Sequence, residues 1–176
     1  MSEVAYIYPV FVIPKGFNLF DKLVMWFTRS KIAHVAYYLE DENKLIEPQP
    51  YDHLWNAYWY YNTLEKHKNE ILEIYRLQVT SEQKFLTEKW LKYLANTKTF
   101  YNYLGVLGFI LPFFTSNGGY FCSEGVYDAM QFADIIKSDL PGWQINPVML
   151  RSIVQDLGGE LYKKLYIDNN GKTRQI

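Results

Sequence analysis

The chain contains segments in which apolar and polar residues alternate, and others in which apolar residues recur every three or four positions. Alternation favours half-buried strands, and the longer period favours amphipathic helices. Residues 71–79 (ILEIYRLQV) alternate, whereas residues 17–29 carry apolar side chains at positions 17, 20, 23, 24 and 27. These patterns predict strands at 4–13, 34–39, 44–47, 71–79 and 161–167, and helices at 17–29, 81–95, 122–133 and 147–156.

Two predicted strands, 34–39 and 44–47, are separated by the hairpin-turn residues 41–43. Two further stretches are ambiguous: residues 51–61 are crowded with aromatics, and residues 103–114 predict a buried short helix or loop. Strands that precede helices, instead of alternating with them, indicate an α+β fold with an antiparallel sheet packed against helices. No internal repeat or linker interrupts the chain, so a single domain is expected over residues 1–176.

Composition narrows the classes of function. With 176 residues, 49% of them apolar, the chain can bury one large core. The 18 basic and 19 acidic residues nearly cancel, so neither a nucleic acid nor an anionic membrane is the expected partner. A single cysteine excludes an intrachain disulfide framework. The first residues lack the basic region of a signal peptide, and the longest apolar run falls short of the roughly 20 residues of a spanning helix. We therefore expect a cytoplasmic protein without stable membrane insertion.

That one cysteine, Cys122, lies in the stretch GGYFCSEGVYDAM at the start of a predicted helix. A helix N-terminus stabilises a thiolate, and a nucleophilic thiolate also needs an imidazole as its base. Three histidines are candidates. His67 lies in the charged stretch LEKHKNE, which indicates a solvated surface. His53 follows Tyr51-Asp52 in an aromatic-rich region, and the sequence leaves open whether it is a core or a surface residue. His34 begins a strand directly after a polar loop, where a sheet edge typically meets a cleft, and it is the preferred base.

The hairpin suggests a third member for this group. Residues 44–47 pair back alongside residues 34–39, and a carboxylate on the returning strand can orient a histidine on its neighbour. Glu47 is the only acid on that strand. From spacing alone the alternative stays open that Cys122 is a small core residue, His34 a capping residue and Glu47 a surface residue.

Three segments resemble motifs of a known family, the circularly permuted papain-like enzymes of the NlpC superfamily (the YiiX/YaeF-like group). FTRSKIAHVAYYLEDENKLIEP resembles the histidine motif, with a polar orienter about a dozen residues after the histidine. KTFYNYLGVLGF resembles the G-x-x-Y-D element, and YFCSEGVYDA resembles the Y-x-C-S-E-L-V motif. The histidine precedes the cysteine, the reverse of papain. The resemblance covers roughly residues 17–156 and implies a permuted papain-like fold with the nucleophile at a helix N-terminus.

The resemblance implies a role for each matching residue. Cys122 is the nucleophile, His34 the base and then the acid, and Glu47 the orienter. Tyr120 and the backbone N–H of Cys122 are the candidates for oxyanion stabilisation, and Ser123 is a further oxyanion or substrate-side candidate, although it also suits the first turn of the helix. The chain departs from the family pattern at Thr99-Phe100, where a glycine is usual, at Asn102, where an aspartate is usual, and at Gly125, where a leucine is common.

The leading hypothesis is a thiol hydrolase that cleaves a peptide-like amide through an acyl-enzyme on Cys122, with an amide derived from cell wall as one candidate substrate. A second hypothesis is a lipid thioesterase or acyltransferase, because relatives of lecithin:retinol acyltransferase share the permuted arrangement. A third is a catalytically silent domain that only binds in the cleft. The expected partner is a small peptide-like or acyl substrate. No cofactor is expected, and the sequence holds no spacing typical of a metal site.

Overall fold

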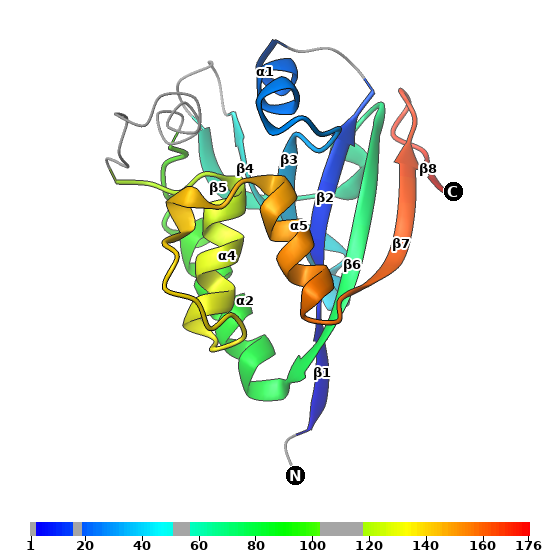
Figure 1. The fold of residues 1–176 in the computed structure, drawn as a ribbon. Helices are drawn as coiled ribbons and strands as arrows, with labels where there is room; N and C mark the ends of the chain where they lie inside the picture. The colour runs from blue at the N-terminus through cyan, green and yellow to red at the C-terminus, as the bar shows by residue number, and fades with distance from the viewer. Residues whose placement is uncertain (1–2, 16–18, 51–56, 103–117) are drawn as a thin grey trace.

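Figure 1 shows a computed structural model of the chain, in which residues 3–15, 19–50, 57–102 and 118–176 are described. The strands are β1 (Val4–Ile7), β2 (Pro9–Pro14), β3 (His34–Leu39), β4 (Lys44–Pro50), β5 (Ala57–Asn62), β6 (Glu70–Thr80), β7 (Glu160–Ile167) and β8 (Thr173–Gln175). The helices are α1 (Leu19–Thr28), α2 (Ser81–Asn96), α4 (Cys122–Phe132) and α5 (Pro147–Asp156). Short 3-10 turns follow β3, β5 and α4: η1 (Glu40–Glu42), η2 (Leu64–Lys66) and η3 (Gly142–Gln144).

The strands form one twisted antiparallel sheet in the order β5-β4-β3-β2-β6-β7-β8, and β1 pairs with the far end of β6. Helices α2, α4 and α5 lie together on one side of this sheet (Figure 1). The predicted α+β class with an antiparallel sheet is therefore confirmed.

Apolar side chains fill both faces of the sheet. On β2, Phe11 points into a core shared with helices α2, α4 and α5, whereas Val10 and Val12 point into a second core on the opposite face. All three residues are at most 2% exposed. A strand buried on both faces is apolar throughout, which explains why β2 does not alternate.

Several predicted boundaries differ from the observed ones. The predicted strand 4–13 is interrupted at Tyr8, whose carbonyl accepts the N–H of Tyr38. The ambiguous aromatic run contains strand β5, and the C-terminal tail contains the short strand β8, neither of which was predicted. The hairpin turn is the 3-10 turn η1, closed by Asn43 in the left-handed conformation (φ 52°). The predictions for residues 51–56 and 103–114 lie outside the described residues.

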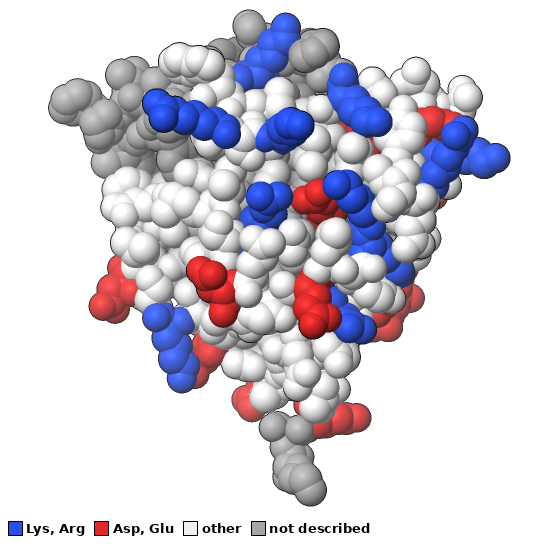
Figure 2. All heavy atoms as spheres, turned by 45° about the vertical axis from the view of Figure 1, so that its right-hand side comes forward, with Lys and Arg blue, Asp and Glu red and all other residues white. Residues whose placement is uncertain are grey.

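The fold brings the start of α4 against the start of β3, although the two are far apart in sequence. Cys122 is the first residue of α4 and belongs to the same buried core as Val35 on β3. Acidic and basic side chains both occur on the face around β7 and β8, in line with the nearly balanced charge (Figure 2). Among the described helices none has the length and apolar character needed to cross a membrane.

Candidate active site

The site begins with Cys122, the first residue of helix α4. Its residue surface is 3% exposed. The first N–H groups of a helix have no partner within the helix and give its start a partial positive charge. A thiolate at this position is therefore stabilised by the helix itself.

His34, the first residue of β3, lies beside the thiol and retains 21% of its side-chain exposure. Its Nε2 lies 2.9 Å from Oε2 of Glu47 on the adjacent strand β4. Continuing the register of the β3–β4 pair places Glu47 diagonally across from His34 on one face. Since Nε2 contacts the carboxylate, Nδ1 is the ring nitrogen left for the thiol. The structure thus brings together the three residues predicted from the sequence.

The charges in this group stabilise one another. Burial lowers the pKa of His34, but the adjacent Cys122 and Glu47 outweigh it and raise the pKa well above its usual value. Burial likewise raises the pKa of the Cys122 thiol, but His34, with smaller contributions from the Val35 N–H and the Tyr101 hydroxyl, lowers it overall. Both directions favour a thiolate–imidazolium pair over a neutral thiol and imidazole.

Tyr101 is a member of the site that was not assigned a role from the sequence. Its hydroxyl donates toward Sγ of Cys122 across 4.0 Å. Tyr101 belongs to the quoted segment KTFYNYLGVLGF, where it matches the tyrosine of the G-x-x-Y-D element. The motif was the available signal, because no periodicity places Tyr101 beside the cysteine.

The two substrate-side candidates lie differently from one another. The Tyr120 ring meets the Trp90 ring edge-on, with 6.1 Å between the centroids, and burial together with Asp128 and Glu124 raises the pKa of Tyr120. Its hydroxyl therefore lies among α2 and α4 side chains, whereas Tyr101 is the tyrosine directed at the thiol. Ser123 is fully buried, and its hydroxyl donates to the carbonyl of Ile145 at 2.7 Å. The Ser123 side chain is thus committed to the core, and a substrate contact would have to use its backbone N–H.

The carboxylate of Glu47 is fully buried and surrounded by donors. While Oε2 faces His34, Oε1 accepts from Gln49 Nε2 at 2.7 Å and Asn62 Nδ2 at 2.7 Å, and lies 2.9 Å from His67 Nε2. Burial raises the pKa of Glu47, but the charge of His67 and the hydrogen bonds from both histidines hold it well below its usual range. Glu47 is therefore a fixed, ionised partner for His34.

The prediction that His67 lies on a solvated surface is wrong. His67 is 4% exposed and sits at the end of η2, with Nε2 toward Glu47 and Nδ1 2.5 Å from Oε2 of Glu70. Its sequence neighbours Lys66 and Lys68 are exposed, which is why the stretch has the composition of a surface. Only the path of the chain between β5 and β6 turns the His67 ring inward.

Two glycines position the helix that carries Cys122. At Gly119 a Cβ would lie 2.7 Å from the carbonyl oxygen of Phe100, and its φ of 141° is a conformation that favours glycine. At Gly125 a Cβ would lie 2.3 Å from the buried ring of Trp59, whose Nε1 donates to the carbonyl of Tyr120. The departure from leucine at Gly125 therefore lets α4 approach β5 closely.

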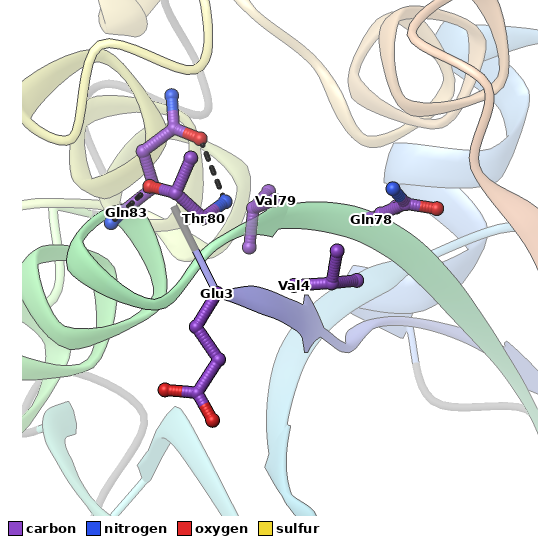
Figure 3. A pocket seen from close by; sticks show the side chains of 6 residues that line it. All are labelled: Glu3, Val4, Gln78, Val79, Thr80 and Gln83. Carbon is purple, nitrogen blue, oxygen red and sulfur yellow. Dashed lines mark hydrogen bonds between the residues drawn. The ribbon is translucent and has the colours of Figure 1, made fainter. Parts of the chain in front are cut away.

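The rest of the described surface offers a less suitable site. A hollow of about 270 Å³ is lined by polar and small side chains where β1, β6 and α2 meet: Glu3, Val4, Gln78, Val79, Thr80 and Gln83 (Figure 3). Its lining contains no cysteine or histidine, and its one hydroxyl, on Thr80, accepts the N–H of Gln83 as the cap of α2. The hollow also lies away from His34. His34 pairs with Val12, and Val12 pairs with Leu72, so Gln78 in the hollow lies six residues along β6 from the level of His34, a distance of roughly 20 Å. Among the described residues no group of three or more His, Cys, Asp or Glu is arranged to hold a metal ion.

Comparison with protein families, curated proteins and solved structures finds no match to this chain. Function is therefore inferred from the chemistry of the residues that the fold brings together.

Proposed function

We propose that this protein is a permuted papain-like thiol hydrolase that cleaves an amide bond through an acyl-enzyme on Cys122. The observation that carries the proposal is the continuous series Cys122–His34–Glu47, with the thiol at a helix start and His34 Nε2 2.9 Å from the Glu47 carboxylate. A buried structural cysteine needs neither an adjacent imidazole nor a fixed carboxylate behind that imidazole.

The proposed reaction has two halves. The Cys122 thiolate attacks the carbonyl carbon, and the tetrahedral oxyanion forms near the first N–H groups of α4, which have no partner within the helix. The imidazolium of His34 then gives its proton to the departing amine, leaving a thioester on Cys122. In the second half, neutral His34 takes a proton from water, the hydroxide attacks the thioester, and the products are a carboxylic acid and the regenerated thiolate.

The charge distribution favours an amide over an ester or thioester substrate. An amine leaves only after protonation, so amide cleavage depends on an acid next to the scissile bond. The neighbours of His34 keep it protonated while Cys122 is ionised, which supplies both the nucleophile and that acid. A peptide-like amide is therefore the proposed substrate class.

The first test is the pH dependence of iodoacetamide alkylation in the wild type and in His34→Ala. Cys122 is the only cysteine, so alkylation reports on it alone. We expect the wild type to react well below the pH at which a free thiol ionises, about 8.5, and His34→Ala to move the profile upward. A Cys122→Ser variant controls for reaction elsewhere. Reaction only at high pH, or only after unfolding, in both proteins would identify Cys122 as a core residue and end the proposal.

If Cys122 is activated, acyl compounds with amide, ester and thioester bonds distinguish the substrate classes. Amide cleavage that His34→Ala abolishes supports the proposal. Turnover of long-chain thioesters without any amide cleavage contradicts it and favours the acyltransferase hypothesis. An activated cysteine that forms no acyl-enzyme with any of them favours a binding domain.

A further inference from the structure

Behind the Cys122 site, four ionisable side chains form an unbroken series toward the surface. His34 Nε2 lies 2.9 Å from Glu47 Oε2, His67 Nε2 lies 2.9 Å from Glu47 Oε1, and His67 Nδ1 lies 2.5 Å from Glu70 Oε2. Exposure rises only at the two ends, to 21% for His34 and 25% for Glu70, while Glu47 and His67 are buried. The residues come from β3, β4, the end of η2 and β6.

The contacts determine the protonation of His67. Both of its ring nitrogens face carboxylate oxygens, and an ionised carboxylate can only accept hydrogen bonds. Neutral histidine carries one N–H, so it would leave one of these short contacts without a proton. The imidazolium has two and satisfies both. The charged groups that face His67 are Glu47 on β4 and Glu70 on β6, while the adjacent Lys66 and Lys68 are exposed.

The positive charge of His67 offsets the cost of burying the Glu47 carboxylate. An isolated carboxylate with no exposed surface, such as that of Glu47, is destabilised strongly unless it is paired and hydrogen-bonded. Gln49 and Asn62 supply hydrogen bonds to Glu47 Oε1, but neither carries a charge. His67 adds the charge without occupying Oε2, which stays directed at His34.

We propose that His67 is a positioning residue of the Cys122 site: held as an imidazolium between Glu47 and Glu70, it keeps Glu47 ionised and directed at His34. This inference rests on the proposed function. With the thiolate and the His34 imidazolium included, charges alternate from Cys122 through His34, Glu47 and His67 to Glu70. Loss of the His67 charge then destabilises the Cys122 thiolate, which lies three members away in this series, although His67 does not touch the reacting atoms.

The protonation is measured directly by ¹⁵N NMR of the histidine rings in the wild-type protein. We expect both ring nitrogens of His67 to stay protonated at pH 7.5 and to titrate near pH 9, because burial lowers its pKa but Glu47 and Glu70 together raise it to about 9. Glu70→Gln, a substitution at the partly exposed end, is expected to lower that titration point. A neutral His67 at pH 7.5 in the wild type overturns the inference, whatever Cys122 does.

The coupling is measured by the alkylation profile of Cys122 in His67→Gln. Glutamine can still donate to Glu47 but carries no charge, so we expect Glu47 to become protonated more readily and the alkylation rate at pH 6.5 to fall about tenfold, equivalent to one pKa unit. Gln49→Ala is the matched control, since it removes a neutral hydrogen bond from the same oxygen, Oε1. A clearly smaller change is expected for Gln49→Ala.

The outcomes separate the two proposals. If the wild-type profile is that of a free thiol, the proposed function fails, while the NMR titration still tests the Glu47–His67–Glu70 group. If the wild type is activated and His67→Gln reacts like the wild type, the inference alone fails. An equal loss in His67→Gln and Gln49→Ala also overturns it, because packing and not charge would then be responsible. Should His67→Gln not fold, Glu70→Gln provides the same comparison. We then expect a smaller loss of the Cys122 alkylation rate, at alkaline pH, because His67 without Glu70 gives up its proton at a lower pH.

Discussion

The Tyr101 hydroxyl is directed at the Cys122 sulfur, with 4.0 Å between Oη and Sγ. A donor at this position favours the ionised sulfur over the thiol, and its contribution to the lowered pKa of Cys122 is smaller than that of His34. Tyr101→Phe removes the hydroxyl and keeps the ring. We expect the alkylation profile of Cys122 to move to higher pH, by less than in His34→Ala. An unchanged profile would show that the ring only packs against the sulfur.

Glu47→Gln tests the carboxylate while keeping the shape of the side chain. Each of the two histidines then loses one of its two negative neighbours, since His34 keeps only Cys122 and His67 keeps only Glu70. We expect alkylation of Cys122 at neutral pH to slow about tenfold or more, and the free energy of unfolding to fall by about 3 kcal/mol. Chemical denaturation and the alkylation profile measure the two effects. Glu65→Gln, at an exposed carboxylate, should change neither.

Ser123→Ala separates a structural from a substrate-side role for this residue. The hydroxyl donates to the Ile145 carbonyl at 2.7 Å inside the core, and its removal leaves that buried carbonyl without this donor. We expect a loss of about 1–3 kcal/mol in the free energy of unfolding, with the alkylation profile of Cys122 unchanged. Loss of turnover at unchanged stability would instead assign Ser123 to the substrate.

The sequence predicts those parts of the site that depend on local geometry. A short turn makes residues 34–39 and 44–47 neighbours, and this pairing is sufficient to place Glu47 beside His34. The N-terminal position of Cys122 on a helix is also a local property. Strand β5 was not predicted, because aromatic side chains occupy both of its faces and remove the alternation.

The parts that were missed depend on tertiary contacts. His67 is flanked by exposed lysines, and only the turn between β5 and β6 directs its ring to Glu47. Gly125 has the poorest helix propensity of its neighbours, and the reason for a glycine here is the close approach of the Trp59 ring, 66 residues earlier in the chain. Propensity and periodicity carry no information about such long-range neighbours.

Gly125→Ala distinguishes local propensity from packing. In an exposed helix the change stabilises by about 1 kcal/mol. Here the added methyl would lie 2.3 Å from a ring that is fully buried and has no room to move. We expect a net loss of about 1–3 kcal/mol in denaturant unfolding. Ser152→Ala, at an exposed position of α5, is the matched control and should be neutral or slightly stabilising. A stabilised Gly125→Ala protein would contradict the close contact between α4 and Trp59.

Glu124, two residues after Cys122, is expected to make the stability of the protein depend on pH. Burial raises its pKa from 4.5 to about 7, although the Phe121 N–H, which donates to its carboxylate at 3.2 Å, acts in the opposite direction. The folded state therefore holds this proton more tightly than the unfolded state, and Glu124 lowers stability progressively as pH rises from about 4.5 through 7. Glu124→Gln keeps an acceptor for the N–H and removes the titration.

We therefore expect Glu124→Gln to match the wild type near pH 4 and to exceed it at pH 8 by up to about 3 kcal/mol, since one pKa unit corresponds to about 1.4 kcal/mol. Urea denaturation at several pH values measures the difference. The control is Glu82→Gln, which removes an exposed carboxylate from the first turn of α2 and should not reproduce the gain in stability at pH 8. A wild-type advantage at pH 8 would contradict this prediction, because it would mean that the ionised Glu124 carboxylate stabilises the start of α4.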